Sequence, residues 1–260
     1  MIAVSLYVFA EAVLLAVIKI MDASQPYAVV GKVEYAAILL SFLVTAVVFL
    51  QRIVMERARY TAPYQRETRP FFDRHGIFIG MLFTLMADTF LVLLKSLGVP
   101  WADLPGVLTF CVVQTVYAVY LDRSRPVLIA RLAVFAGVTA LLFALHMFEP
   151  VNIAAGWSIV WLTGNVIVSF LRAAGTGAST EKTGSLFMNT GSRRGGHKVL
   201  SAWFFFAGLL LFLCCDLSVG IYNLTWGVAG METVSAVFYF LIWMFYLPSQ
   251  VLIPLSYLFN

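Results

Sequence analysis

Apolar runs of membrane-spanning length dominate this chain and limit what it can fold into. Crossing the hydrocarbon core of a bilayer takes about 20 apolar residues in a helix. Eight such runs follow one another here, over residues 2–20, 34–51, 76–97, 105–121, 127–147, 151–171, 199–222 and 233–259. The sequence therefore predicts an all-α integral membrane protein with eight transmembrane helices, forming a single transmembrane domain over residues 1–260.

The charge content agrees with this prediction. Charged residues make up 12% of the chain, whereas a soluble domain carries about 25%. One globular core of this size cannot bury so much apolar surface. The composition thus excludes a soluble enzyme, a nucleic-acid binder and a disordered chain. Because Glu11 lies in the middle of the first run and no basic segment precedes it, we interpret this run as a retained helix rather than a signal peptide.

The basic residues predict one orientation in the membrane. Most of the 17 Lys and Arg residues lie in the loops 52–75, 122–126 and 172–198, and Arg131 follows one turn into the next helix. By the positive-inside rule these loops and both termini are cytoplasmic. The three basic residues assigned to the other side are Lys19, Lys32 and Lys95.

Two of these loops have compositions of their own. The segment 173–198 is rich in Gly, Ser and Thr, which predicts a mobile loop. The loop 52–75 carries aromatic residues among its arginines, so it either binds anionic lipid headgroups or only sets the topology. The aromatic residues are Tyr60, Tyr64, Phe71 and Phe72.

A short repeat links the two halves of the chain. The segment from Gly80 to Asp88 resembles that from Gly208 to Asp216, with Gly, two Leu and Asp at matching positions and an offset of 128 residues. Each half would hold four helices, which favours a parallel 4+4 repeat. The half-repeats would be residues 1–126 and 127–260.

The repeat places two aspartates deep in the predicted third and seventh helices. A carboxylate at that depth costs several kcal/mol or more, so Asp88 and Asp216 are expected to face the bundle interior and to be functional. The alternative is a protonated Asp that only hydrogen-bonds a neighbouring helix. Glu11 is either a third lining residue or a partner of a neighbouring helix, and its position does not choose between them.

Further polar residues recur at helical spacing around these acids. Gln114 and Tyr117 are neighbours on the fourth helix, as are Tyr246 and Gln250 on the eighth, where Pro248 is expected to kink or loosen the helix. Asn165 belongs to an i, i+4 stripe of the sixth helix, with Trp157, Trp161 and Ser169. Taken singly, such residues more often serve as hydrogen bonds between helices.

At these residues the chain resembles the YhhN family, whose animal members are transmembrane lysoplasmalogenases. The family repeats a Gly-rich apolar helix that ends in Asp, and residues 80–91 and 207–218 follow this pattern. Its last helix carries Tyr-x-x-Ala-Gln-x-Leu-Ile, where this chain reads Tyr246-Leu-Pro-Ser-Gln250-Val-Leu-Ile253. Its fourth helix has His-x-x-Tyr, whereas here Gln114 replaces the His. Lys32 stands where the family has a Lys before its second helix.

The resemblance implies hydrolysis of the vinyl ether bond of lysoplasmalogens, giving a fatty aldehyde and glycerophosphocholine or glycerophosphoethanolamine. Such a bond is cleaved by protonation of its β-carbon, and water then captures the oxocarbenium ion. Glycosidases divide similar work between two carboxyl groups. We assign Asp88 and Asp216 as catalytic, and we expect no metal or cofactor. The sequence does not decide which aspartate is the acid, and we choose Asp216 because its neighbours Phe212, Cys214 and Cys215 favour the more apolar pocket. Substrate-binding roles fall to Gln114, Tyr117, Tyr246, Gln250 and Asn165.

Other functions remain open from the residues. A proton-coupled transporter of a small molecule or lipid is the main alternative, because transporters also carry intramembrane acids and repeats. A zinc hydrolase is not expected, since His75 and His197 fall at one end of the bundle and His146 at the other. The expected partners are a lysophospholipid and membrane lipids, and the sequence leaves a second copy of the chain open as a further partner. A bacterial plasma membrane and a eukaryotic endomembrane fit equally well.

Overall fold

The computed structural model describes residues 2–22, 27–59, 71–183 and 192–259, and within these ranges the chain forms helices and no strand. Eight of its helices are long and apolar enough to cross a membrane, which confirms the predicted number. They are α1 (Ile2–Asp22), α2 (Tyr27–Arg59), α3 (Phe71–Asp88), α4 (Asp103–Leu121), α5 (Arg125–Ala144), α6 (Pro150–Thr183), α7 (Ser192–Thr225) and α8 (Glu232–Phe259). A short π-helix, η1 (Thr89–Leu94), continues α3.

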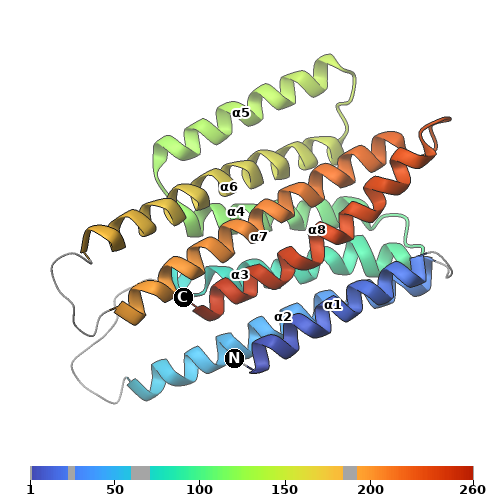
Figure 1. Ribbon diagram of the computed structural model, residues 1–260. Helices are drawn as coiled ribbons and strands as arrows, with labels where there is room; N and C mark the ends of the chain where they lie inside the picture. Colours follow the sequence, from blue (N-terminus) through green and yellow to red (C-terminus); the bar gives the residue numbers. More distant parts are fainter. Residues whose placement is uncertain (1, 23–26, 60–70, 184–191, 260) are drawn as a thin grey trace.

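Successive helices run in opposite directions, so α1 begins and α8 ends at the same end of the bundle (Figure 1). We call this the basic end, because Arg52, Arg123, Arg125 and Arg172 lie towards it. Both chain ends therefore lie on one side, as eight spans require. That this side faces the cytoplasm stays a prediction.

Five helices form a closed ring in which each packs on the next. Moving around it, α3 packs on α4, α4 on α6, α6 on α7, α7 on α8, and α8 returns to α3. The α7–α8 pair makes the most extensive contact and the α3–α8 pair the slightest within the ring. Helix α2 covers the α3–α8 junction from outside, and α1 packs on α2 and α8.

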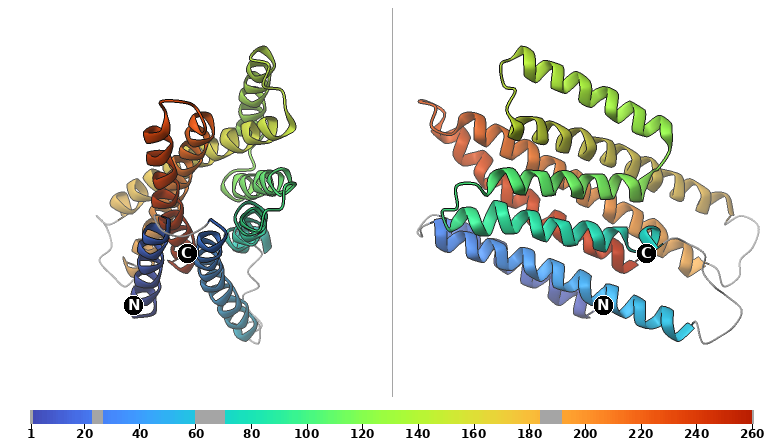
Figure 2. Two further views of the ribbon diagram at one scale, coloured as in Figure 1. Left: turned by 90° about the vertical axis from the view of Figure 1, so that its right-hand side faces the viewer. Right: turned by 180° about the vertical axis from the view of Figure 1, so that it is seen from behind.

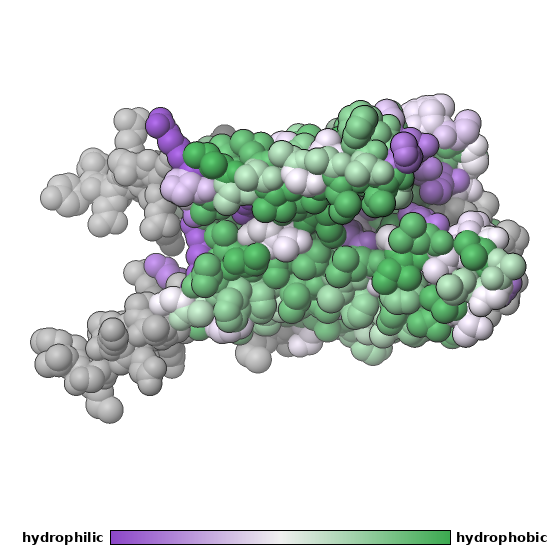
Figure 3. Space-filling model, turned by 90° about the horizontal axis from the view of Figure 1, so that it is seen from above, coloured by the Kyte–Doolittle hydropathy of each residue, from purple (hydrophilic) through white to green (hydrophobic). Residues whose placement is uncertain are grey.

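Helix α5 is the exception, because among the described elements it packs on α6 alone (Figure 2). Most of its apolar side chains are exposed, including Ile129, Val134 and Phe143. The space-filling view has a broad hydrophobic band along the helices, with hydrophilic side chains gathered towards the ends (Figure 3). An exposed apolar band of this kind suits lipid contact.

Several helices extend beyond the predicted spans. Helix α2 runs on to Arg59 and α3 starts at Phe71, so part of the predicted loop 52–75 is helical. Likewise α6 and α7 occupy much of the predicted loop 172–198. The apolar run marks where lipid would end, but backbone hydrogen bonds continue a helix into water. Residues 60–70, with Tyr60 and Tyr64, and residues 184–191 lie outside the described ranges.

Helix α8 passes two prolines without interruption, so the expected loosening at Pro248 does not break it. A proline lacks an N–H, and Pro254 therefore leaves the carbonyl of Gln250 without its helical partner. The Tyr7 hydroxyl of α1 donates a 3.2 Å hydrogen bond to this carbonyl. The proline thus creates the acceptor through which α1 is attached to α8.

Candidate functional site

The two repeat aspartates approach each other inside the ring. Asp88 ends α3 and is 5% exposed, whereas Asp216 of α7 is partly exposed. Although α3 and α7 do not pack directly, the two carboxyl groups are close enough to interact electrostatically. The Tyr246 hydroxyl of α8 donates a short hydrogen bond to Asp88 Oδ2. Three residues predicted from separate helices therefore gather at one position.

Asp216 has no hydrogen-bond partner among the described residues, in contrast to Asp88. Its surroundings are apolar and aromatic: Phe212, one turn away, packs on Tyr246 with ring centroids 5.5 Å apart. Phe212 also contacts Phe110 of α4 across the ring at 5.0 Å. Cys215 lies within electrostatic range of both carboxyl groups. The acid pair thus combines one hydrogen-bonded carboxyl group with one that remains available to a ligand.

The backbone changes form directly after Asp88. Residues Thr89–Leu94 adopt a π-helix, a rare geometry that occurs frequently at functional sites. The Thr89 hydroxyl donates to the carbonyl of Leu85 at 2.7 Å and lies 2.9 Å from the Tyr35 hydroxyl of α2. The wider turn therefore begins at the acid and is held by side-chain hydrogen bonds.

A second buried polar group joins α4, α5 and α6. The Arg131 guanidinium donates through Nη1 to Asn165 Oδ1 at 2.8 Å. Asn165 Nδ2 donates to the carbonyl of Gln114 at 2.9 Å and is 3.3 Å from Gln114 Oε1. Gln114 Nε2 is buried and has no partner among the described residues. Gln114 and Asn165, two predicted site residues, therefore contact each other directly.

Tyr117 lies on the same face of α4 as Gln114. Its ring packs on Phe205 of α7, with centroids 5.6 Å apart, and against Gly80 of α3. A Cβ at Gly80 would lie 2.1 Å from Tyr117 Cε1, so only glycine leaves room for this ring. The Tyr117 hydroxyl is beside that of Thr84 but makes no hydrogen bond of normal geometry. The predicted stripe of Gly80, Thr84 and Asp88 is thus buried, with Gly80 and Thr84 against Tyr117 and Asp88 against Tyr246.

Gln250 belongs to a different cluster from the acid pair. Its side chain reaches Ser249, and its carbonyl receives the Tyr7 hydroxyl. The Tyr7 hydroxyl also donates to Ser41 Oγ of α2 at 2.9 Å, and the Ser41 hydroxyl donates to Glu11 Oε1 at 2.8 Å. Glu11 therefore pairs with a neighbouring helix, which is one of its two predicted alternatives.

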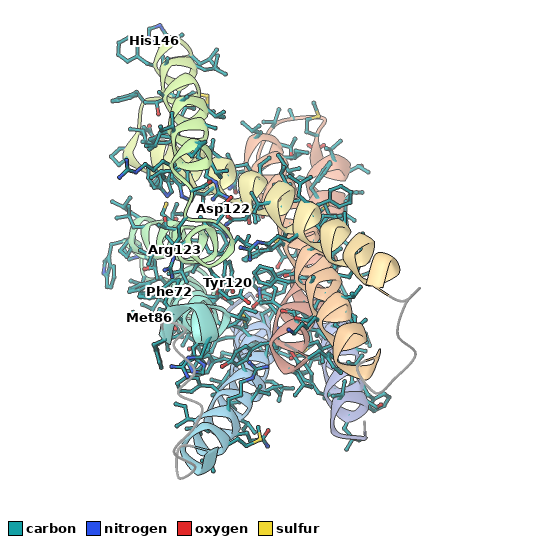
Figure 4. All side chains as sticks on the ribbon, turned by 90° about the vertical axis from the view of Figure 1, so that its left-hand side faces the viewer. Phe72, Met86, Tyr120, Asp122, Arg123 and His146 are labelled. Atoms are coloured by element: carbon teal, nitrogen blue, oxygen red, sulfur yellow. The ribbon has the colours of Figure 1, made fainter. Side chains whose placement is uncertain are left out.

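Tightly packed polar and aromatic side chains close the basic end between α2, α3 and α8. His75 Nδ1 and the Tyr257 hydroxyl are 2.8 Å apart, and both side chains are buried. Arg52 lies over the Tyr257 ring, 4.3 Å from its centroid, and donates to the Tyr257 carbonyl. His146 lies at the opposite end of α5, away from Asp122 and Arg123 (Figure 4). The side chain of His197 is outside the part that the structure describes.

The turn between α4 and α5 is held by Asp122. Its Oδ1 accepts the Ser124 backbone N–H at 2.7 Å, and this hydrogen bond lowers the pKa of the Asp122 carboxyl group. The nearby charges of Arg172 and Arg131 act in the same direction. Arg123 lies over Phe72 of α3, 5.4 Å from the ring centroid (Figure 4). This short loop therefore connects the basic ends of three helices.

Sequence reasoning missed two buried charged residues. Glu34 is 1% exposed, but it stands at the first position of the predicted span 34–51, where an acid is easily assigned to the loop. Because α2 begins at Tyr27, Glu34 lies two turns inside the helix. Arg131 was counted only as a topology signal, and its side chain points inward to α6. Both charged residues have apolar neighbours on either side in the sequence, and this pattern was the signal that could have indicated burial.

Two apolar surface hollows lie away from the acids. One, of about 380 Å³, is formed mainly by α4 residues together with Phe72 and Trp157. The other, of about 530 Å³, runs along α5 beside Phe148. Neither includes Asp88 or Asp216, so the acid pair is distinguished by its chemistry rather than by surface shape.

The comparisons with known proteins leave this site to be interpreted from its own geometry. No family model, no curated protein and no solved structure matches the chain.

Proposed function

We propose that this protein is an intramembrane hydrolase that cleaves the vinyl ether bond of a lysoplasmalogen. The observation that carries the proposal is the convergence of Asp88 and Asp216, from helices that do not pack together, with Tyr246 donating to Asp88. The motif resemblance to the YhhN family, with its transmembrane lysoplasmalogenases, names the same reaction. Location in a membrane is part of the proposal, and so are the parallel repeat and a homodimer.

The asymmetry of the pair suggests how the work is divided. Tyr246 donates a hydrogen bond to Asp88, and such a donor stabilises a carboxylate anion. Asp216 lacks this donor, is more exposed and faces the negative charge of Asp88. Two carboxyl groups in this arrangement share one proton. We therefore assign Asp216 as the acid and Asp88 as the ionised partner.

The proposed reaction balances without a cofactor. The Asp216 proton goes to the β-carbon of the vinyl ether, and the π electrons form the new C–H bond, leaving an oxocarbenium ion. Asp88 stabilises this cation and takes a proton from the attacking water, so that a hemiacetal forms. The hemiacetal then breaks its C–O bond to the glycerol, releasing a fatty aldehyde and the glycerol hydroxyl. One water is consumed, and a proton returns to Asp216.

The closed basic end favours an enzyme over a proton-coupled transporter. Between the acids and this end lie the Tyr117–Phe205 contact and the buried pair of His75 and Tyr257. A transporter needs access from both sides in turn, whereas a hydrolase needs only one entrance. Asp216 is partly exposed, so the acid pair is in contact with the surface of the bundle on that side.

The test is an assay of fatty aldehyde released from lysoplasmenylcholine or lysoplasmenylethanolamine by the purified protein. The proposal expects turnover by the wild type and almost none by Asp88→Asn and Asp216→Asn, both still folded. Uptake of a labelled solute into proteoliposomes without aldehyde release would instead identify a transporter.

A further inference from the structure

Hydrogen bonds from Arg131 through Asn165 to Gln114 fix the orientation of the buried side-chain amide of Gln114. Arg131 can only donate, so the Asn165 oxygen must face it. The Asn165 nitrogen then faces Gln114 and donates to its carbonyl and towards its side-chain oxygen. Because that oxygen is turned to Asn165, Gln114 Nε2 must point elsewhere. The Arg131 guanidinium thus determines, through Asn165, the direction in which the Gln114 side-chain amide points.

The donor at the end of these hydrogen bonds has nothing to bind. Gln114 is fully buried, and Nε2 has no hydrogen-bond partner among the described residues. Three residues further on the same face, the Tyr117 hydroxyl lies beside the Thr84 hydroxyl but makes no hydrogen bond of normal geometry with any described residue. Leaving a buried polar group unsatisfied is costly, and native proteins do so rarely. Two such groups side by side indicate a missing polar atom of a ligand.

The two unsatisfied groups face the ring interior near the acids. Gln114 lies between Phe110 and Tyr117, which both contact α7 across the ring. The Tyr117 hydroxyl lies beside Thr84, which precedes Asp88 by one turn of α3, a rise of about 6 Å. The missing atom would therefore sit about one helical turn from the acid pair.

A hydroxyl fits the two groups, because its oxygen accepts from Gln114 Nε2 while the Tyr117 hydroxyl donates to it or accepts from it. Gln114 Nε2 can only donate, whereas the Tyr117 hydroxyl can donate or accept. Both are neutral, and Arg131 is separated from them by Asn165, so neither of these two groups nor this arginine offers a phosphate a direct charged partner there. In a lysoplasmalogen the free sn-2 hydroxyl is five bonds from the vinyl β-carbon, a reach of about 6 Å by standard bond lengths.

We propose that Gln114 and Tyr117 bind the free sn-2 hydroxyl of the substrate, and that Arg131 and Asn165 are positioning residues for Gln114. This inference rests on the proposed function, because it takes the glycerol next to the vinyl ether as the ligand. It makes the site selective for lysolipids, since the acyl chain of an sn-2 ester does not fit among buried side chains. A lost hydroxyl would leave both groups unpaired, which typically costs one to two orders of magnitude in binding or rate.

The first test measures binding and needs no hydrolysis. Two saturated ether lipids serve as probes: 1-O-hexadecyl-glycerophosphocholine with a free sn-2 hydroxyl, and its 2-deoxy analogue. We expect the wild type to bind the hydroxyl form about 10- to 100-fold more tightly. Gln114→Met keeps the side-chain volume without the donor and should bind both probes equally. Equal binding of both probes by the wild type overturns the inference.

A substitution at Asn165, which links Arg131 to Gln114, tests whether these hydrogen bonds orient Gln114 or only stabilise the fold. Asn165→Asp keeps an acceptor for Arg131 but loses the Nδ2 donor that orients Gln114. The protein should stay folded and lose its preference for the hydroxyl probe, as should Arg131→Met. The controls are Asn152→Asp on the same helix and Arg125→Met on α5, which should keep the preference. If Asn165→Asp also keeps it, Asn165 is only structural and the positioning claim fails.

A kinetic test distinguishes this inference from the proposed function. With vinyl ether substrates, Gln114→Met should lower kcat/KM for the lysoplasmalogen and leave that for its 2-deoxy analogue unchanged. If the wild type releases no aldehyde but still prefers the hydroxyl probe, the hydrolase proposal is wrong and the hydroxyl site stands. If aldehyde is released equally from both substrates, the hydrolase proposal stands and the hydroxyl site is wrong.

Discussion

Two clusters in this bundle place a buried carboxyl group beside a tyrosine hydroxyl, and they differ in one respect. Glu11 has no second carboxyl group described beside it. Its carboxyl group accepts a hydrogen bond from Ser41, and the Tyr7 hydroxyl donates to the Gln250 carbonyl of α8. Asp88 instead faces a second carboxyl group, Asp216, which has no hydrogen-bond partner among the described residues. The first cluster connects three helices to one another. The second retains a carboxyl group that no described residue hydrogen-bonds, and this is the group that the proposed reaction uses.

This difference teaches that a buried acid alone does not mark an active site. An acid in a membrane span is costly, and either a helix contact or a function can compensate. In the sequence, Glu11 and Asp88 both lie deep inside an apolar run of membrane-spanning length, so their positions alone do not distinguish them. What separates them is the number of carboxyl groups that the fold brings together, and this requires a contact between distant helices.

The largest expected effect sharpens that comparison directly. Asp216→Asn removes the proposed acid and should lower aldehyde release by about 1,000-fold or more. Glu11→Gln, the matched loss of a buried carboxyl group, should keep turnover within a few-fold of wild type. Steady-state aldehyde assays on the purified variants decide the point. Equal losses in both variants would erase the distinction between the clusters.

The two tyrosines provide the next comparison. Tyr246→Phe removes the donor to Asp88 and should lower kcat about 10- to 100-fold with little change in KM. Tyr7→Phe removes the hydrogen bond to the Gln250 carbonyl and should cost about 1 kcal/mol of stability, leaving kcat unchanged. Kinetics and thermal unfolding in one detergent measure both. A fall in kcat for Tyr7→Phe would place the Glu11 cluster in the catalytic site.

A packing change should affect the acid cluster without touching a carboxyl group. In Gly80→Ala the new Cβ meets the Tyr117 ring, so we expect a loss of about 1–3 kcal/mol and reduced turnover. Gly137→Ala on α5 has open space around its Cβ and should be neutral in both respects. Unfolding midpoints and aldehyde release are the measurements. Wild-type behaviour of Gly80→Ala would mean that Tyr117 is not held against α3.

The smallest expected effect lies outside both clusters, at the turn before α5. The pKa of Asp122 is lowered in the folded protein, so its ionised form stabilises the fold at pH values above its ordinary pKa of 3.8. That stability is lost as pH falls through the lowered folded value. Asp122→Asn should therefore unfold at a slightly lower temperature at pH 7, and the deficit should vanish in acid. Ser124→Ala keeps the backbone donor, which is the largest cause of the lowered pKa, and loses only the weaker Ser124 side-chain hydrogen bond, so it should retain most of the wild-type pH dependence.

The sequence was sufficient for the helices but not for their ends. Lipid-crossing length is a property of composition, so the eight spans followed from run lengths alone. Where a helix stops is decided by backbone hydrogen bonds that no apolar count records, as α2 and α6 demonstrate by running past their spans. The π-helix after Asp88 likewise has no composition signal, since Thr89–Leu94 reads as ordinary apolar helix.

For the candidate site, sequence predicted the residues better than their partners. Asp88 and Asp216 stood out because charge is scarce in the chain, and Gln114 and Asn165 because polar residues recurred at helical spacing. The sequence predicted that the two aspartates act together, but the contact between Gln114 and Asn165 could not be predicted, because it depends on which helices become neighbours in the ring. Arg131 was missed for a related reason: near a helix end an arginine can reach water, and only the contact with Asn165 shows that it turns inward.

The central claim is that an intramembrane acid pair protonates carbon, and hydrolysis in D₂O tests it most directly. Protonation of the vinyl β-carbon by Asp216 places one solvent-derived hydrogen at C2 of the released aldehyde. The account predicts a fatty aldehyde with a single deuterium at C2, trapped by immediate reduction and measured by mass spectrometry, and no such product from Asp216→Asn. No aldehyde from the wild type, or aldehyde without deuterium at C2, would contradict it.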